Sequence, residues 1–286
     1  AWGQALDPRI LKEHLDKEPG VKAVFAPLCE PSTGVAFDIK ALAHVVKDTE
    51  AVLVVDAISG LGAIDLKADE WGVDVVVSGS QKGFMLPPGL GFISVSKKAW
   101  KLVEVSKCPK YYFDLKVAKK TLDKTDTPWT PAIGIIIALN EALKMMHAEG
   151  YENIFARHRK LAEATRAAMK ALGLELFAPK AASDAVTAAK VPAGIDGEKL
   201  VKVMRDEYGV TIAGGQGEMK GKLVRIAHMG YMSEFDIVLG MSENGLRTLA
   251  KTNPKGFMRD GFPRDLAQAE ALDKLLAKIN QPLDLV

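Results

Sequence analysis

Two hydrophobic patterns alternate along the first half of the chain. Runs of mainly apolar residues, rich in Val, occupy positions 21–27, 51–55, 73–77 and 91–95. Apolar residues spaced three or four apart occupy positions 8–17 and 38–47. Continuous apolar runs are typical of strands in a parallel sheet covered by helices on both faces. The alternation therefore predicts an α/β fold with right-handed crossovers.

The pattern changes after Tyr111. Residues 116–126 are polar and rich in Lys, and the two prolines within 127–131 predict an extended loop that enters a helix. Further elements follow this loop: helices at 132–147, 151–172, 197–208, 233–250 and 263–280, and strands at 185–190, 210–212 and 223–227. We therefore expect a large domain over residues 1–149 and a smaller α/β domain with an extra helical tail over residues 150–286.

Composition and charge narrow the kind of protein. The 286 residues include 38 Lys and Arg against 36 Asp and Glu, a net charge of +2, which favours neither nucleic acid nor a membrane surface. No apolar run is long enough to span a bilayer. Cys29 and Cys108 form no disulfide framework, and the histidines lack partners at metal-ligand spacing. We expect a cytoplasmic protein without a metal site.

Two residues with chemical potential follow predicted strands. Asp56 comes directly after residues 51–55, and Lys82 lies just past residues 73–77. Ligands of open α/β sheets bind beyond the carboxyl ends of such strands, although a turn aspartate and a surface lysine are the simpler interpretations of each residue alone. The apolar, Gly- and Pro-rich residues 83–91 would partly desolvate the Lys82 amine and make it nucleophilic.

The spacing between Asp56 and Lys82 corresponds to one strand–helix–strand step, so the two side chains can face one pocket. An acid and a nucleophilic lysine placed in this way suit pyridoxal phosphate. The carboxylate keeps the ring nitrogen protonated, and the lysine forms a Schiff base with the aldehyde.

Three further residues have two interpretations each. Arg225 lies inside the apolar run 223–227, where a guanidinium needs a partner, which is either a substrate carboxylate or a structural ion pair. His228 lies three positions further on, towards the other face of an ideal strand, and we expect it to be structural rather than a site residue. Cys29 lies at a strand mouth as a nucleophile or, as we expect, as a buried inert thiol.

Several segments resemble those of class V aminotransferases, in the branch of the serine–glyoxylate, alanine–glyoxylate and serine–pyruvate aminotransferases. The main segments are Val-Val-Asp-Ala-Ile-Ser-Gly-Leu-Gly at 54–62, Ser-Gly-Ser-Gln-Lys at 78–82 and Pro-Pro-Gly-Leu at 87–90. Segments 30–35, 127–131 and 224–226 support them, and the similarity runs in one order from Trp2 to about Ala250. The resemblance implies the type I fold of transferases that depend on pyridoxal phosphate, with a mainly parallel large domain and a smaller α/β C-terminal domain.

The resemblance also implies roles for the residues that contact the cofactor. Lys82 resembles the Schiff-base lysine that also carries the α-proton, and Asp56 resembles the acid paired with the pyridine nitrogen. Ile58 resembles the aliphatic residue packed on the ring, and Gln81 matches a phosphate contact. Thr130 matches a hydroxyl that reaches the phosphate in the neighbouring subunit, which implies a homodimer.

The implied activity is transamination. Arg225 matches the arginine that binds the substrate α-carboxylate, and the amino group would move between serine or alanine and glyoxylate or pyruvate. Two alternatives remain from the sequence. One is a lyase or cysteine desulfurase of the same fold, and the other is a non-catalytic interaction or subunit protein.

Three departures from the family pattern affect the expected site. Pro31 stands where relatives have a Ser or Thr that contacts the cofactor, and it has neither a hydroxyl nor an N–H group. Thr127 stands where some relatives have a Tyr. Relatives also have a longer N-terminal segment with the Gly-rich phosphate loop, so we expect this chain by itself to bind pyridoxal phosphate weakly or not at all.

Overall fold

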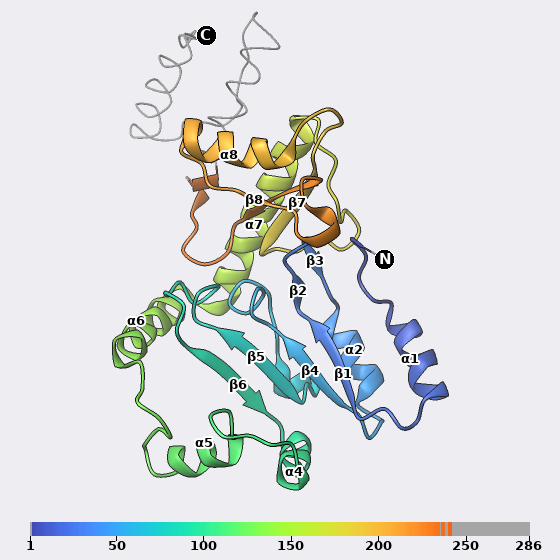
Figure 1. Ribbon diagram of the computed structural model, residues 1–286, viewed down its shortest axis with the longest axis vertical. Coiled ribbons are helices and arrows are strands. Elements are labelled where there is room, and N and C mark those ends of the chain that lie inside the picture. Colours follow the sequence, from blue (N-terminus) through green and yellow to red (C-terminus); the bar gives the residue numbers. More distant parts are fainter. Residues whose placement is uncertain (1, 235, 238–239, 242–286) are drawn as a thin grey trace, which may run out of the picture.

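The computed structural model describes residues 2–234, 236–237 and 240–241. Figure 1 shows two stacked parts, a lower one built on a four-stranded sheet and an upper C-terminal lobe. The expected helix at 263–280 lies outside the described residues, as does most of the expected helix at 233–250. None of the helices in the described part is both long and apolar enough to cross a membrane.

The lower sheet has the strand order β1-β4-β5-β6. Its strands are β1 (Ala23–Pro27), β4 (Val52–Asp56), β5 (Val75–Gly79) and β6 (Gly91–Val95). β1, β4 and β5 run parallel, which confirms the mainly parallel sheet. The register pairs Pro27 with Asp56 and Asp56 with Val77, so the carboxyl ends of the three strands meet at one edge. This edge faces the C-terminal lobe (Figure 1).

β6 runs antiparallel to β5, contrary to the all-parallel pattern that the sequence suggested. The connection from Ser80 to Leu90 contains no helix, and a parallel return needs a crossover, usually helical, of a dozen or more residues. The chain therefore turns back beside β5 and forms the edge strand. This connection carries Lys82, so the reversal places the lysine at the carboxyl edge of β5.

One face of the lower sheet forms the core. α1 (Pro8–Lys17) and α2 (Ile39–Val46) supply Leu11 and Leu42, which pack against Leu53 of β4. On the other face, Phe25 of β1 is 76% exposed between two buried neighbours. The expected helical cover is therefore present on one face only, within the part of the chain that the structure describes.

Several short elements had no counterpart in the sequence prediction. They are β2 (Cys29–Glu30), β3 (Val35–Ala36), α3 (Ala68–Trp71), α4 (Lys97–Val105) and α5 (Leu115–Leu122). Ser96 and Asp114 cap α4 and α5 through hydrogen bonds from Ala99 N and Lys116 N. The segment 116–126, which the pattern left without an element, is therefore partly helical.

The C-terminal lobe follows the predicted order with one shift. α6 (Ile133–Glu149) and α7 (Tyr151–Ala171) lead into an antiparallel sheet of order β7-β9-β8, with α8 (Gly197–Tyr208) beside it. The strands are β7 (Val186–Lys190), β9 (Leu223–Ala227) and β8 (Ala213–Gly214), and a 3-10 turn spans Gly217–Met219. The strand expected at 210–212 is wrong, because Val210 N still bonds the carbonyl of Met204 as the chain leaves α8.

The hairpin of β2 and β3 joins the two parts. Val35 bridges Ala182, Ala36 N donates to Ala181 O at 2.8 Å, and Ser183 N donates to Gly34 O at 2.9 Å. Backbone pairing of this kind fixes residues 29–36 between the sheet and the lobe. The lobe thereby lies over the carboxyl edge of the parallel strands.

Candidate active site

Asp56 ends β4 with an exposed carboxylate at the carboxyl edge of the sheet. Its Oδ1 accepts a hydrogen bond from Ile58 N at 2.9 Å, which turns the chain directly after the strand. Its main-chain carbonyl accepts from Leu28 N at 2.7 Å. Both bonds fix the residue at the sheet edge, and the exposed carboxylate keeps accepting capacity to spare.

Lys82 lies in a tight loop closed by a buried serine. Ser80 Oγ donates to Pro87 O at 2.7 Å and accepts from Leu90 N at 3.2 Å, so the two ends of the loop are tied together. The Lys82 carbonyl accepts from Met85 N at 3.0 Å. The Lys82 side chain is half-buried, and its amine makes no hydrogen bond or ion pair with any residue that the structure describes.

Two glycines bring the Asp56 and Lys82 loops into backbone contact. A Cβ on Gly83 would lie 2.1 Å from the Leu61 carbonyl oxygen, which no side chain tolerates. Gly62 has φ +86°, and a Cβ there would lie 3.1 Å from the carbonyl carbon of Gly83. The loops that follow β4 and β5 therefore touch, and the acid and the amine belong to one surface.

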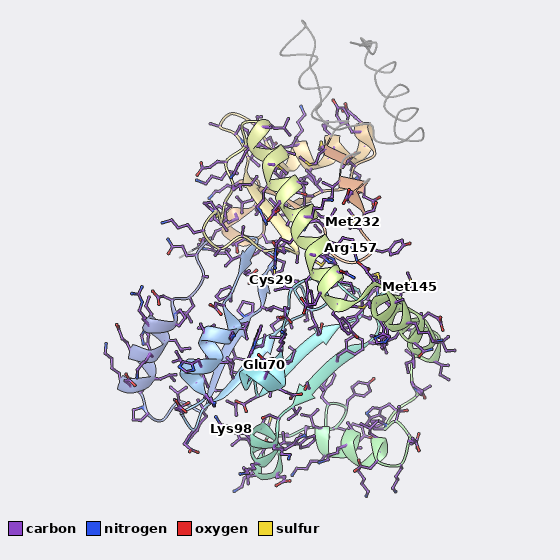
Figure 2. The ribbon with its side chains drawn as sticks, turned by 180° about the vertical axis from the view of Figure 1, so that it is seen from behind. Cys29, Glu70, Lys98, Met145, Arg157 and Met232 are labelled. Atoms are coloured by element: carbon purple, nitrogen blue, oxygen red, sulfur yellow. The ribbon has the colours of Figure 1, made fainter. Side chains whose placement is uncertain are left out.

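The thiol of Cys29 lies within the electrostatic reach of both groups. Burial raises the pKa of Cys29 to about 11, the hydrogen-bonding contact with Ser183 Oγ at 3.0 Å opposes this, and Glu30 and Asp56 raise it while Lys82 lowers it. Figure 2 shows Cys29 where the sheet meets the lobe. The raised pKa favours the protonated thiol at neutral pH, and the expected burial of Cys29 is confirmed.

Arg225 lies in the middle of β9, half-buried, and reaches across to the hairpin. Its Nε donates to Gly214 O and its Nη1 donates to Pro31 O, each at 2.8 Å. Burial lowers the pKa of the guanidinium, and the charge of Glu30 opposes this. Among the described residues no carboxylate forms an ion pair with it, so the structural ion pair that the sequence left open is absent there. The remaining N–H groups have no protein acceptor within the same residues.

The other predicted contacts lie at different places. Ile58 is half-buried next to Asp56, and Gln81 is exposed, with its Oε1 2.7 Å from the position of a Cβ on Gly79. The structure thus brings Asp56, Ile58, Gln81 and Lys82 to one edge of the sheet. Thr130 is exposed in the loop between α5 and α6, which runs beyond β6 in Figure 1. No hydrogen bond joins Thr130 to the other four within the described chain.

The family model described as aminotransferase class-V matches residues 3–237. The chain belongs to the class-V aminotransferase family. The cofactor of this family is pyridoxal 5'-phosphate, in agreement with the sequence prediction.

Relatives and solved structures that are named aminotransferases agree with this assignment, and one similar protein has a different name. A protein of Synechococcus named soluble hydrogenase, small subunit, is 44% identical over 88% of this chain and 67% of its own length. The serine–glyoxylate aminotransferase of Methylorubrum extorquens is 37% identical over 86% of this chain and 66% of its own length. The crystal structure of pyridoxamine–pyruvate aminotransferase from Mesorhizobium loti superposes with a TM-score of 0.80 at 29% identity, covering 96% of this chain and 69% of that one.

This class-V aminotransferase chain spans about two thirds of the length of the Synechococcus protein. It spans slightly less than two thirds of the length of other relatives. Structures of cysteine desulfurases are also similar, at 20% identity for the one from Thermococcus onnurineus, and show the shared fold alone.

The two loops at the carboxyl edge carry the groups that decide whether this class-V site fits the family cofactor. An amine with no protein partner in the described chain lies on one loop, and a carboxylate with spare accepting capacity lies on the loop that touches it. These are the two groups that a pyridine aldehyde needs at its opposite ends. Pro31 offers no hydroxyl, and its carbonyl is already bonded to Arg225. The residues present therefore fit the ring and its aldehyde.

Three residues around the candidate site were not predicted from the sequence. His158 was considered only as a metal ligand, and its buried ring bonds the main chain of Ile154 and Gly230. The charge of Glu30 raises the pKa of both Cys29 and Arg225. Ser80 closes the Lys82 loop. Only Ser80 carried a signal, since it lies next to Gln81 and Lys82, whereas the contacts of His158 and Glu30 join residues far apart in the chain.

His228 is structural, as expected. Its Nδ1 lies 3.0 Å from Asp184 O, a carbonyl that can only accept, so Nδ1 carries a proton, and its Nε2 lies 2.9 Å from Thr187 Oγ1. Burial lowers the pKa of His228 to about 4, and the hydrogen bond to Asp184 opposes this. Within the described residues, no group of three or more His, Cys, Asp or Glu side chains is placed to hold a metal ion.

Proposed function

We propose that this protein is a transaminase that uses pyridoxal phosphate to move an amino group between a small amino acid, serine or alanine, and a 2-oxo acid, glyoxylate or pyruvate. The observation that carries this proposal is the contact between the Asp56 and Lys82 loops, which bear an acid and an amine that has no protein partner among the described residues. The names of relatives such as the serine–glyoxylate aminotransferases support the substrate class.

The cofactor supplies an electron sink for the electrons released when the α-proton of the substrate leaves. The chain's own residues hold and orient it. Lys82 Nζ would bind the aldehyde covalently and carry the proton, and Asp56 would keep a proton on the ring nitrogen through its carboxylate. Ile58 would pack on the ring and Gln81 would contact the phosphate. Asp56 is suited to this role because Ile58 N already fixes one of its oxygens.

Arg225 would bind the α-carboxylate of the substrate. Two of its N–H groups are held by Gly214 O and Pro31 O, which orients the guanidinium plane and leaves the others for a bidentate contact. Because those two acceptors are uncharged carbonyls, the positive charge is not neutralised by them. A carboxylate ligand is the partner that such a half-buried cation lacks.

A homodimer is the assembly that we propose. Large apolar side chains are exposed on α6 and on the segment before α5, namely Tyr111, Tyr112, Phe113, Ile133, Ile136 and Ile137. An exposed patch of this kind is typical of an interface. Thr130 lies between these two groups in the chain, so a second copy packed there would receive its hydroxyl near the cofactor phosphate.

The domain boundary and the location complete the proposal. We place the boundary between a large cofactor domain, residues 1–149, and a small C-terminal domain, residues 150–286, at Gly150, which has φ +86° and separates α6 from α7. A cytoplasmic location is consistent with two unpaired cysteines.

The alternatives have less support. A desulfurase needs a mobile, reactive thiolate, and Cys29 is buried with a raised pKa. A non-catalytic protein has no need of an amine left without a partner beside an acid.

Replacement of the lysine tests the proposal directly. The variant Lys82→Ala should lose transamination in assays with serine or alanine as donor and glyoxylate or pyruvate as acceptor, because no other amine lies on the two touching loops. Lys101→Ala, which removes an exposed lysine of α4, is the matched control and should keep full activity. Activity of the Lys82→Ala variant close to that of the unchanged protein would overturn the assignment.

A further inference from the structure

We infer that Arg157 and His158, neighbours in the first turns of α7, are positioning residues that hold the turn 228–232 against the Lys82 loop and thereby fix the backbone that carries the Lys82 amine. The inference rests on the role proposed for Lys82. Neither side chain bonds Asp56 or Lys82 within the described chain, so both act through Gly230.

His158 holds the N–H group of Gly230. The ring is 1% exposed, with Nε2 3.0 Å from Gly230 N and Nδ1 2.7 Å from Ile154 O. Because Gly230 N is a donor and Ile154 O an acceptor, the ring is neutral and carries its proton on Nδ1. Burial lowers the pKa of His158, and this keeps Nε2 available as an acceptor at neutral pH.

Arg157 holds the carbonyl groups of the same turn. Its Nη1 donates to Gly230 O at 3.1 Å and to Met232 O at 2.9 Å. The other edge of the guanidinium pairs with Glu149, the last residue of α6, through Nε–Oε1 at 2.6 Å and Nη2–Oε2 at 3.0 Å. Figure 2 shows Arg157 and Met232 together where α7 meets the sheet. Both polar groups of Gly230 are therefore bound by adjacent side chains of one helix.

Gly230, which both side chains bind, packs against the backbone of Lys82. It has φ +81°, and a Cβ there would lie 3.2 Å from the Lys82 carbonyl oxygen and 3.6 Å from Met85 Cγ. The Lys82 carbonyl in turn accepts the hydrogen bond of Met85 N that closes the turn of the loop. Met85 adopts φ +64°, a conformation that a side chain of this kind rarely takes without support. The turn 228–232 packs beside Met85 and supports this conformation.

The contacts run in one line from the α6–α7 joint to the lysine. Glu149 orients Arg157, Arg157 and His158 hold Gly230, and Gly230 lies on the carbonyl of Lys82. Loss of either α7 side chain would release the turn, and the Lys82 loop would lose the surface that covers its backbone. We therefore expect the half-buried Lys82 side chain to become more accessible and its amine more reactive towards solvent reagents.

The test measures the reactivity of the amine rather than turnover. Each purified protein is labelled with formaldehyde and cyanoborohydride across a range of pH, and methylation of Lys82 is followed by peptide mass spectrometry, with Lys101 as an internal reference. His158→Leu and Arg157→Ala should raise the Lys82 rate relative to Lys101 by about threefold or more, as expected for loss of a hydrogen bond of ordinary strength.

Conservative variants separate positioning from general stability. His158→Gln retains an acceptor and a donor, and Arg157→Lys retains one donor, so each should return the Lys82 rate most of the way to that of the unchanged protein. They also serve where the larger changes fail to fold, as judged by circular dichroism. If folded His158→Leu or Arg157→Ala leaves the Lys82 rate and its pH profile unchanged, the inference is wrong.

The outcome is independent of the proposed function. Methylation needs no cofactor, so a shifted Lys82 rate supports the positioning role even if pyridoxal phosphate is never captured at Lys82. Failure to capture it would remove the proposed function alone.

Discussion

Asp56 and Lys82 are held to different degrees by their neighbours. One Asp56 oxygen is fixed by Ile58 N at 2.9 Å, whereas the Lys82 amine has no protein partner in the described chain and only the backbone of its loop is fixed. This difference suits their proposed tasks, since a ring partner needs a fixed position and a proton carrier needs freedom to move. It also allows the charge of Asp56 to be tested without moving the residue.

The variant Asp56→Asn keeps an oxygen that can accept from Ile58 N but removes the negative charge. We expect kcat for transamination to fall about a hundredfold or more, the usual effect of losing a preorganised electrostatic partner of developing charge. Steady-state kinetics with saturating donor measure the change, and denaturant unfolding checks that stability is kept. Turnover within a few fold of the unchanged protein would show that Asp56 does not face the ring.

Sequence alone could predict these residues because each lies in a local pattern. Asp56 ends an apolar run, and Lys82 follows small residues that permit a tight turn. It could not predict Glu30 or Gly230 as parts of the surroundings, since their importance depends on Cys29, Arg225 and His158, which lie elsewhere in the chain.

At the scale of elements, the strands were predicted better than the connections between them. Buried Val-rich runs are set by local hydrophobicity, so β1, β4, β5 and β9 lie within one or two residues of their expected positions. The direction of β6 and the hairpin of β2 and β3 depend on pairing with distant segments. α4 and α5 expose most of their residues, including apolar ones such as Leu102 and Leu122, and each begins at a cap, Ser96 or Asp114.

His228, which directly follows β9, makes the free energy of unfolding depend on pH. Its folded pKa, about 4, lies below the ordinary value of 6.5, so the unfolded chain binds the proton first as the pH falls. Stability from this group is therefore complete above pH 6.5 and is lost as the pH falls towards 4. Between pH 7 and 5 the loss is about 2 kcal/mol.

Denaturant unfolding at pH 7 and pH 5 measures this loss, with His228→Gln as the variant that cannot titrate. The loss between the two pH values should be smaller in His228→Gln by about 2 kcal/mol. The same loss in both proteins would mean that other groups, such as His158, whose pKa is also lowered by burial, carry the dependence.

At the scale of the whole molecule, the family and the α/β architecture were predictable, and the joint between the two parts was not. The joint depends on Arg225 with Pro31 and on Cys29 with Ser183, pairs separated by 194 and 154 positions. No local pattern encodes such pairs. They become visible only when the lobe is seen over the carboxyl edge of the sheet.

The proposed dimer makes a prediction at this scale. Ile137 on α6 is 61% exposed, and Ile137→Asp should place an unpaired charge in the interface and shift the protein towards monomer in sedimentation velocity runs. Ile195→Asp is the matched control, because Ile195 is 50% exposed on the other part of the molecule and should leave the association unchanged. Equal behaviour of the two variants would place the interface elsewhere.

The most direct measurement is capture of the cofactor. The protein is incubated with pyridoxal phosphate at saturating concentration, then reduced with borohydride and mapped by peptide mass spectrometry. The account predicts an adduct on Lys82 in clear excess over exposed lysines such as Lys101, and loss of that excess in Asp56→Asn. Labelling spread over the lysines according to exposure, with no preference for Lys82, would contradict it.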